Sequence, residues 1–291
     1  MATQEIKILN GPSLQLKEFK LASMGPNPSI CMIAKRASGK SWLCRNIIKN
    51  YMHLPGGVII SKTERMNPFY GKFFPDLYIH YEYTSEKINR VLERQRQIIE
   101  KCKEKHKQGK KVDPRAFIIM DDCLASKGSW MNDQPMMEIF FNGRHYQLMF
   151  ILTMQFPLGI RPELRCNFDY IFLLAEDMFS NQKRLYDHYA GMFPSFEAFR
   201  QVFQQLTADY GSMVIVNRGA KPNLAEKVFW FKATNEEVTH IGCEQFNKFH
   251  DKNYDAKWSD KNRSIDLNTY GTNKKKPKIF VEKMETLQPK S

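Results

Sequence analysis

The sequence predicts an α/β protein in which a mostly parallel sheet carries helices on both faces. Two observations lead to this fold class. Short apolar runs of strand length alternate with helical segments, and the connections between the runs are long enough for crossovers. In addition, polar and acidic residues follow some of these runs, at the end where an open parallel sheet collects its ligands. The 291 residues can bury one large core or two small ones.

Residues 1–28 are expected to form a leading strand and a loop. The next stretch, SICMIAKRASGKSWLCRNIIK at residues 29–49, predicts a short strand over 29–34, a tight polar turn and a helix that begins at Gly39. Apolar residues spaced three or four apart predict the buried side of this helix. They are Trp42, Leu43, Ile47, Ile48 and Tyr51.

The turn between this strand and this helix fits a phosphate-binding P-loop. Backbone N–H groups at a helix start point at an anion, and the helix dipole favours negative charge there. Lys40 is expected to reach the β- and γ-phosphates of a nucleotide, and the Ser41 hydroxyl to bind Mg²⁺. The motif G-x-x-x-x-G-K-[ST] asks for glycine at Ala34, so this residue is strained or the loop starts differently, and Ala37 stiffens the turn further. The alternative is an incidental strand–turn–helix.

A second apolar run, AFIIM at residues 116–120, predicts a strand that ends in two acids. Before it, short strands are expected at 58–60 and 77–81, and a long polar helix over 85–108 with Ser85 as its N-cap. Asp121 is expected to hold Mg²⁺ through water, and Asp122 to orient or deprotonate the attacking water. The alternative is a strand followed by a helix-capping Asp.

The alternation continues through the second half of the chain. A helix is expected over 134–144 and a strand over 148–153, and Gln155 follows this strand as a candidate sensor of the γ-phosphate. Asn, Ser or Thr could serve equally in that role. The remaining predicted elements are a strand over 169–174, helices near 181–189 and 195–206, and strands over 212–216 and 227–231.

The net charge of +13 suggests a polyanionic partner. Residues 84–115 hold eleven Lys and Arg against five Asp and Glu, and residues 252–291 hold ten against five. From about Lys252 the sequence becomes polar and lysine-rich, which predicts a tail that acts as a nucleic-acid arm or a nuclear-import-like patch. The alternatives are a solvated helix for the first segment and a disordered tail for the second.

The sequence argues against membrane insertion and secretion. No uninterrupted apolar run approaches the roughly 18 residues of a transmembrane helix, so no membrane span is expected. The N-terminus lacks the apolar core of a secretory signal, so the protein is not expected to be secreted. Six cysteines are scattered without a C-x-x-C pair, which favours reduced thiols in a cytosolic compartment.

Taken in this order, the motifs closely resemble the genome-packaging ATPases of large nucleocytoplasmic DNA viruses, of the poxvirus and iridovirus type within the FtsK–HerA superfamily. The resemblance covers about residues 20–235. It rests on AKRASGKSWL (34–43), FIIMDDC (117–123), FNGRHYQLMFILTMQFPLGIRPELRCNFDYIFLL (141–174) and FPSFEAFRQVFQQLTADYGSMVIV (193–216).

The resemblance implies a three-layer, RecA-like P-loop NTPase in which the Gln155 strand lies between the P-loop strand and the Asp121 strand. It implies ATP and Mg²⁺ as cofactors, and a pentameric or hexameric ring that threads double-stranded DNA into a preformed capsid. Capsid or membrane-associated virion proteins would be further partners, and the host cytoplasm at the virus assembly site and the virion would be the locations. The expected division is a lead segment over 1–28, the ATPase domain over 29–250 and a basic, flexible tail over 251–291.

The resemblance also assigns site residues. Arg144 is the candidate for an arginine that acts on a neighbouring subunit's γ-phosphate, and its alternative is a structural arginine paired with a carboxylate. Relatives usually carry Gly at Ala34 and Ala37, and this departure bears on loop geometry and turnover rate more than on nucleotide binding. Many superfamily members carry Glu at Asp122, so the shorter acid is expected to bridge to water by a different reach. The nucleotide-binding set is Ala34, Lys35, Arg36, Ala37, Ser38, Gly39, Lys40, Ser41 and Trp42; the catalytic set is Lys40, Asp121, Asp122, Gln155 and Arg144; the metal ligands are Ser41 and Asp121.

Two other functions remain compatible with these residues. A P-loop kinase for a small molecule predicts a monomer or dimer whose hydrolysis is indifferent to DNA. An idle or slow P-loop protein that acts as a basic nucleic-acid scaffold predicts DNA binding without ATP turnover, and Ala34 keeps this alternative open.

Overall fold

The computed structural model of the protein describes residues 3–7, 13–123 and 130–257. The chain divides into two units, Met1–Lys252 and Asn253–Ser291, and the elements that form the fold lie in the first. The lysine-rich run at residues 274–278 lies outside the described residues. Within the described ranges, no helix combines the length and the apolar character needed to cross a bilayer.

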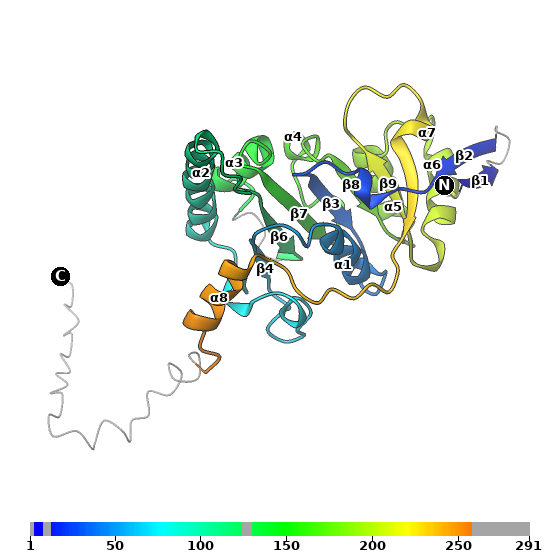
Figure 1. Cartoon of the computed structure of the whole chain (residues 1–291). Coiled ribbons are helices and arrows are strands. Elements are labelled where there is room, and N and C mark those ends of the chain that lie inside the picture. The colour runs from blue at the N-terminus through cyan, green and yellow to red at the C-terminus, as the bar shows by residue number, and fades with distance from the viewer. Residues whose placement is uncertain (1–2, 8–12, 124–129, 258–291) are drawn as a thin grey trace, which may run out of the picture. The chain divides into compact units, whose positions relative to one another are not determined.

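An eight-stranded sheet forms the centre of the first unit, in the order β10-β9-β8-β3-β7-β6-β4-β5 (Figure 1). The six strands from β8 to β5 run parallel, and β9 and β10 are antiparallel additions at one edge. This confirms the predicted mostly parallel sheet, and β7 lies between β3 and β6 as the resemblance implied. The strands are β3 (Ser29–Ile33), β4 (Gly57–Ser61), β5 (Ile79–His80), β6 (Ala116–Asp121), β7 (Leu148–Met154), β8 (Tyr170–Leu173), β9 (Gly211–Val216) and β10 (Val228–Lys232).

Helices cover both faces of this sheet and complete the three layers (Figure 1). One face carries α2 (Ser85–Lys107), α3 (Gln134–Asn142), α4 (Pro162–Arg165), α5 (Phe179–Tyr189) and α6 (Phe196–Leu206). The other face carries α1 (Lys40–Asn50) and the 3₁₀ turns Tyr70–Lys72 and Asp76–Tyr78. Shorter elements are the 3₁₀ turns Leu21–Ser23 and Ala208–Tyr210, α7 (Leu224–Lys227) and α8 (Glu244–Asn253).

Alternation along the central strands builds a separate core on each face. In β6, Ile118 and Met120 pack under α2 and α3, whereas Phe117 and Ile119 pack on the face of α1. This is the two-residue period of a strand. Because both faces of a parallel sheet are buried, such strands are continuous apolar runs, which is why the sequence revealed them.

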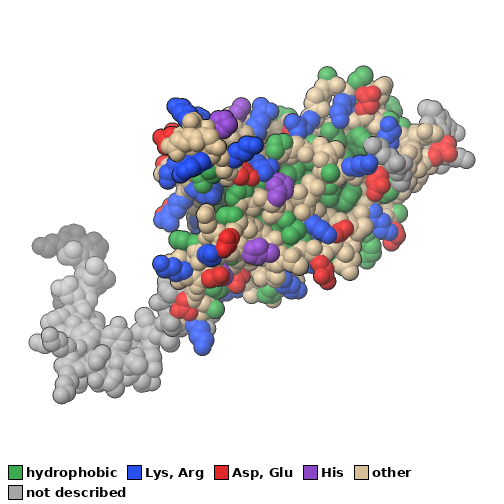
Figure 2. Space-filling model, viewed as in Figure 1, with side chains coloured by type: hydrophobic (Ala, Val, Ile, Leu, Met, Phe, Trp, Pro, Cys, Tyr) green, Lys and Arg blue, Asp and Glu red, His purple; other side chains and the backbone are tan. Residues whose placement is uncertain are grey.

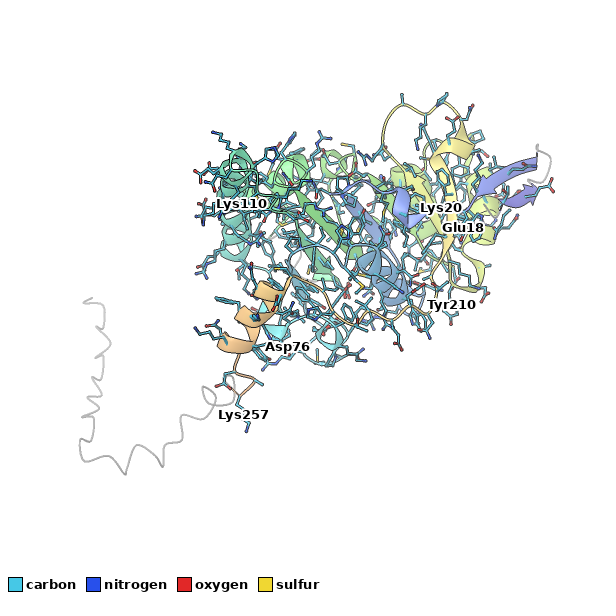
Figure 3. All side chains as sticks on the ribbon, in the orientation of Figure 1. Glu18, Lys20, Asp76, Lys110, Tyr210 and Lys257 are labelled. Atoms are coloured by element: carbon cyan, nitrogen blue, oxygen red, sulfur yellow. The ribbon has the colours of Figure 1, made fainter. Side chains whose placement is uncertain are left out.

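The chain before β3 forms a hairpin, so the predicted single leading strand is wrong. β1 (Thr3–Lys7) pairs antiparallel with β2 (Ser13–Lys17). Both strands are short and carry polar residues, so neither has the apolar run that marks the central strands. After β2 the chain passes along β10 at Glu18 (Figure 3). Glu18 forms a bridge with Trp230, and the Phe19 N–H donates to the Trp230 carbonyl oxygen at 2.8 Å. This segment covers the outer edge of β10.

Two local details differ from the sequence predictions. Thr84, and not Ser85, caps α2, because the Thr84 side chain accepts a hydrogen bond from the Lys87 N–H. Trp42 does not join the buried side of α1: it is 45% exposed, whereas Leu43 and Ile47 are buried. Trp42 lies in the first turn of α1 and lines a cavity instead of packing on the sheet.

All six cysteines are free thiols, as the sequence predicted. Cys44 and Cys123 are buried, and Cys166 and Cys243 are exposed. Burial raises the pKa of Cys44 and of Cys123 to about 12 in each case, with the nearby Asp121 carboxylate adding to the effect. These two thiols are therefore protonated, and unreactive as nucleophiles, at neutral pH.

Candidate nucleotide site

The P-loop connects β3 to α1, and its backbone shows where the unusual alanines fit. Ala34 continues the extended path of β3: its N–H donates to the Met154 carbonyl oxygen at 3.0 Å, and it is buried. Ala37, by contrast, has a φ of +60°. The loop therefore places its strain at Ala37 and not at Ala34, where a non-glycine residue in the left-handed region costs about 1–2 kcal/mol.

The first turn of α1 offers unsatisfied donors to an anion. Gly39 has a φ of +94° and precedes the helix without a side-chain cap. Among the described residues, no acceptor takes a hydrogen bond from the N–H of Gly39, Lys40, Ser41 or Trp42. Such free N–H groups, together with the positive end of the helix dipole, favour a phosphate.

Lys40, Asp121 and Thr153 form a hydrogen-bonded cluster. Asp121 and Thr153 lie at the carboxyl ends of β6 and β7, and Lys40 is the first residue of α1, which follows β3. The Lys40 Nζ lies 2.9 Å from Asp121 Oδ1 and 3.3 Å from Thr153 Oγ1. The Thr153 hydroxyl donates to Asp121 Oδ1. Thr153 is fully buried and Asp121 is 8% exposed. The structure thus joins the P-loop lysine to the first acid of β6, as expected of one shared site.

Asp122 and Gln155 form a second pair in the same place. The Gln155 Nε2 donates to Asp122 Oδ2, and the Asp122 N–H donates to Thr153 Oγ1 at 3.1 Å. Asp122 has a φ of +52°, an uncommon conformation for a non-glycine residue that often marks functional positions. The alternative role of a helix-capping Asp is not realised by Asp121, which is the last residue of β6 and binds Lys40.

The oxygen donors at this site fit Mg²⁺. The Asp121 carboxylate is nearly buried, and the Ser41 hydroxyl makes no hydrogen bond within the described part of the chain. Hydroxyl and carboxylate oxygens are hard ligands, which Mg²⁺ prefers, and it usually keeps several waters besides one or two carboxylates and phosphates. Ser41 and Asp121 are therefore suited to supply oxygen ligands to the ion.

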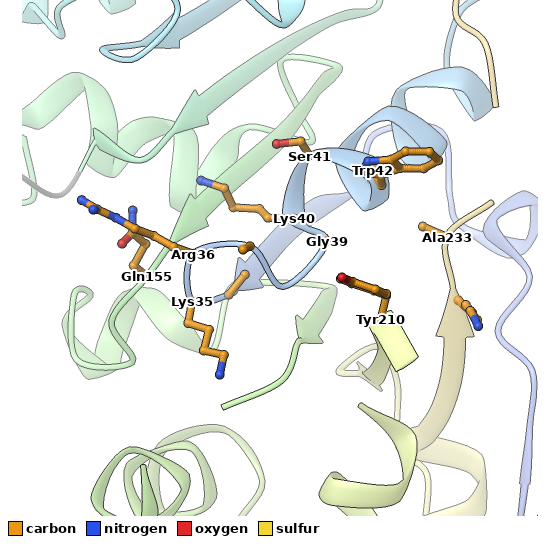
Figure 4. Close-up of a pocket in the computed structure, with 12 residues that line it drawn as sticks. Lys35, Arg36, Gly39, Lys40, Ser41, Trp42, Gln155, Tyr210 and Ala233 are labelled. Atoms are coloured by element: carbon orange, nitrogen blue, oxygen red, sulfur yellow. The ribbon is translucent and has the colours of Figure 1, made fainter. Parts of the chain in front are cut away.

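A cavity of about 740 Å³ lies over the P-loop (Figure 4). Lys35 in this loop pairs with Asp177, which follows β8. Arg36 is exposed and also reaches the cavity. The full lining is Ala34, Lys35, Arg36, Ala37, Gly39, Lys40, Ser41, Trp42, Gln155, Tyr210, Lys232 and Ala233. Of the predicted nucleotide-binding set, Ser38 is absent from this lining, because it is buried and its hydroxyl donates to the Lys35 carbonyl oxygen.

Arg144 lies apart from this cluster. It follows α3 and precedes β7, so it stands at the amino end of the strand whose carboxyl end carries Thr153 and Gln155. It lines a separate cavity of about 370 Å³ together with Ser29, the first residue of β3. It is exposed and forms no ion pair with any residue that the structure describes. Within one subunit Arg144 therefore cannot join the site.

The sequence reasoning missed two residues of this site. Thr153 was expected only as the end of an apolar strand, although a hydroxyl in the otherwise apolar run LMFILTM was a usable signal. Tyr210 lines the cavity from the turn before β9, some 170 residues after the P-loop, and nothing local connects it to a phosphate site.

The fold and the site together define the class of this protein: it is a P-loop NTPase with a RecA-like sheet. The phosphate loop follows β3, the paired acids end β6, and a polar side chain follows β7 between them. The chain belongs to the poxvirus A32 protein family, whose model matches residues 13–189.

Known proteins agree with this assignment. The chain is 50% identical over 250 residues to the uncharacterized protein L437 of Acanthamoeba polyphaga mimivirus, covering 86% of this chain and 88% of that one. Its fold is similar to the genome packaging NTPase B204 of Sulfolobus turreted icosahedral virus 2 (16% identity, 74% of this chain and 100% of that one, TM-score 0.50). It is also similar to the pCW3 conjugation coupling protein TcpA (11% identity, 85% and 70%, TM-score 0.53). These findings confirm the fold class and the resemblance inferred from the motifs.

Proposed function

We propose that this protein is an ATP-driven double-stranded DNA translocase that packages a viral genome into its capsid. The observation that carries the proposal is the cluster in which Lys40, Thr153 and Asp121 meet beneath the free N–H groups of α1, with Asp122 and Gln155 beside it. It brings a cation, a metal-binding carboxylate and a second carboxylate to the helix start that favours phosphate.

Each residue has a distinct role in the proposed hydrolysis. The N–H groups from Gly39 to Trp42 bind phosphate oxygens, and the Lys40 ammonium neutralises their charge. The Ser41 hydroxyl and the Asp121 carboxylate would hold Mg²⁺, which would supply further positive charge to the phosphates. Asp122 orients the attacking water or accepts its proton.

Gln155 is proposed to report on the γ-phosphate through Asp122. Its amide is already bonded to the Asp122 carboxylate, so a change at either side chain alters the position of the other. This pair lies directly after β6 and β7.

Basic surface supports a polyanionic substrate. Lysine and arginine side chains gather over α2 and the loop after it (Figure 2). Six exposed lysines between residues 101 and 111 form no ion pair within the described residues, and cationic groups of this kind bind DNA phosphates. They are Lys101, Lys103, Lys105, Lys107, Lys110 and Lys111.

The comparisons support the packaging role. The chain belongs to the poxvirus A32 family and shares its fold with B204, a genome packaging NTPase. The proposed place of action is a virus assembly site in the host cytoplasm. We further propose a pentameric or hexameric ring, in which Arg144 of one subunit acts on the γ-phosphate of its neighbour. Capsid or membrane-associated virion proteins would anchor this ring.

Steady-state ATP hydrolysis, measured with and without double-stranded DNA, tests the proposal. DNA should stimulate turnover of the unaltered protein. Lys40→Ala should abolish turnover because phosphate charge is no longer neutralised, and Asp122→Asn should abolish it while ATP binding persists. Losses of the size seen for catalytic groups, about 100-fold or more, are expected.

Other outcomes would favour the competing functions. Turnover that Lys40→Ala leaves unchanged would contradict the site. Turnover indifferent to DNA would favour a small-molecule kinase, and DNA binding without any turnover would favour a scaffold. Lys49→Ala is the matched control, because Lys49 lies at the far end of α1 and pairs with Glu236.

A further inference from the structure

The cavity over the P-loop extends beyond the groups proposed to bind the terminal phosphate. Lys40 and Gln155 lie at one end, and Trp42, Tyr210 and Ala233 lie at the other (Figure 4). The first end offers an ammonium and an amide, and the second offers two aromatic rings. A ligand that fills the cavity is therefore elongated, with a polyanionic end and a planar, apolar end.

A strained turn positions Tyr210. This residue ends the 3₁₀ turn Ala208–Tyr210, in which Asp209 has a φ of +49° and Tyr210 a φ of +60°. Two consecutive non-glycine residues in the left-handed region are rare, and such strain collects at ligand-binding positions. The ion pair between Lys232 of β10 and Asp209 holds the turn to the sheet.

The turn places the Tyr210 ring directly beside the P-loop. A Cβ built on Gly39 would lie 3.5 Å from Tyr210 Cδ1, which is van der Waals contact. Tyr210 comes from the chain just before β9, and Ala233 follows β10. The aromatic end of the cavity thus lies toward β9 and β10, and the phosphate end lies toward β7 and β6.

Both side chains are accessible to a ligand, although the Arg45 guanidinium lies 5.7 Å from the centroid of the Trp42 ring. Tyr210 is 65% exposed and Trp42 is 45% exposed. Single exposed aromatic residues are ordinary on a protein surface. Here two of them, from distant parts of the chain, line one cavity beside a phosphate loop. They offer a planar base aromatic surface on which to stack.

We infer that Tyr210 and Trp42 form the nucleobase subsite, where the base of ATP stacks while its phosphates bind at the start of α1. This inference rests on the proposed function, because it deepens the use of the same cavity. Stacking on an aromatic ring needs only the π-face of a base, so these two side chains supply affinity for the nucleoside that the phosphate loop does not.

Equilibrium binding of two ligands tests the subsite: Mg-ATP, and inorganic tripolyphosphate, which has the phosphates but no base. Tyr210→Ala should weaken ATP binding by roughly 5- to 100-fold, the loss expected when one stacked base loses its ring. It should leave tripolyphosphate binding unchanged, which also shows that the variant is folded. In hydrolysis, KM for ATP should rise while kcat is retained.

Conservative and control variants sharpen the test. Tyr210→Phe keeps the ring and should bind ATP as the unaltered protein does. Trp42→Phe should remove the change in tryptophan fluorescence that ATP produces, while ATP still binds. Tyr81→Ala changes an exposed tyrosine outside this cavity and should affect neither ligand.

The failures of the two proposals are distinguishable. If the unaltered protein bound neither ATP nor tripolyphosphate, the proposed function would fall, and this subsite with it. If ATP bound but Tyr210→Ala left its affinity unchanged, or weakened both ligands equally, only the subsite would be overturned.

Discussion

Thr153 connects the groups of the nucleotide site at the scale of single residues. Its hydroxyl accepts hydrogen bonds from the Lys40 ammonium and the Asp122 N–H, and donates to the Asp121 carboxylate. One donor and two acceptor positions are the full capacity of a hydroxyl. All of this capacity is used at a fully buried position, so the side chain fixes where both acids lie.

Replacing this hydroxyl should affect stability and turnover together. Thr153→Val keeps the shape but leaves the half-buried Asp122 N–H and the buried Asp121 carboxylate without this partner, which should lower the free energy of unfolding by about 1–3 kcal/mol. ATP hydrolysis should fall as well, because Asp121 and Asp122 lose their common partner. Thr153→Ser restores the hydroxyl and should recover both properties. Denaturant unfolding and hydrolysis assays that found the Val variant unchanged would contradict this role.

His80 gives the protein a defined pH dependence. Burial, and secondarily the charge of Lys87, lower the pKa of His80 from 6.5 to about 4. Between these values the unfolded chain binds a proton that the folded protein does not, so stability should decrease as the pH falls from about 6.5 toward 4. Below both pKa values the effect no longer grows.

Denaturant midpoints measured at neutral pH and near pH 5 check this prediction. His80→Gln should lose less stability between the two pH values than the unaltered protein does. His145→Gln changes an exposed histidine and serves as the control. An equal loss in His80→Gln and in the unaltered protein would rule out His80 as the source.

Site residues could be predicted from the sequence where they belong to a local motif. Lys40, Asp121 and Gln155 each follow a recognisable strand, and the structure places them together. Whether they perform the expected roles stays a prediction. Tyr210 could not be predicted, because its place depends on how β9 packs beside β8, which no short stretch of sequence encodes. Of the two alternatives left open for Ala34, strain or a loop that starts differently, the structure shows the second, because Ala37 and not Ala34 adopts the left-handed conformation.

At the scale of elements, α2 is fixed to the sheet by a buried amide as well as by its thin apolar stripe. Gln95 is fully buried, and its Nε2 donates to the carbonyl oxygens of Pro114 (2.9 Å) and Tyr146 (2.8 Å). These residues belong to the connections that lead into β6 and β7. One side chain of α2 therefore positions the starts of both strands whose other ends carry Asp121, Asp122 and Gln155.

Gln95→Ala should be strongly destabilising. It leaves two carbonyl groups without this donor and creates a cavity, for an expected loss of about 2–4 kcal/mol. Gln97 lies on the exposed side of α2. The free energy of unfolding of Gln97→Ala should therefore stay within about 0.5 kcal/mol of that of the unaltered protein. Equal effects of the two substitutions on the denaturant midpoint would show that the buried amide is not the connection described.

The type of most elements followed from periodicity, but their order in the sheet did not. Continuous apolar runs revealed β3, β6, β7, β8 and β9 because both of their faces are buried. The hairpin of β1 and β2 was missed, since its strands are short and polar. The position of β7 between β3 and β6 came from resemblance, because it depends on the pairing of β7 with β3, which lies more than a hundred residues earlier.

At the scale of the whole molecule, the position of Arg144 means that it could act on a nucleotide site only in a neighbouring subunit of the proposed ring. It lies at the amino ends of the strands, away from Lys40 in its own chain. Adding Arg144→Ala subunits to unaltered ones should therefore reduce ATP hydrolysis more than in proportion to their fraction, because each altered subunit impairs a neighbour. A strictly linear loss across the mixing series would count against action between subunits.

The division of the chain also stays a prediction at this scale. The lead segment over 1–28 and the basic tail over 251–291 were expected to flank one ATPase domain. Deleting residues 258–291 and measuring DNA affinity would show whether the tail contributes to the basic surface. The lysines of α2 lie in the described fold and would remain.

The covered edge of β10 limits how such subunits can assemble. Glu18 and Phe19 occupy the outer edge of this strand, and at the opposite border of the sheet β5 has only two residues. Neither border presents a long row of open peptide groups to another chain. This disfavours joining the sheets of neighbouring subunits into one continuous ribbon. In the proposed ring, side chains from loops and helices would instead hold the subunits together, and such contacts could loosen and re-form during hydrolysis without unzipping any backbone pairing.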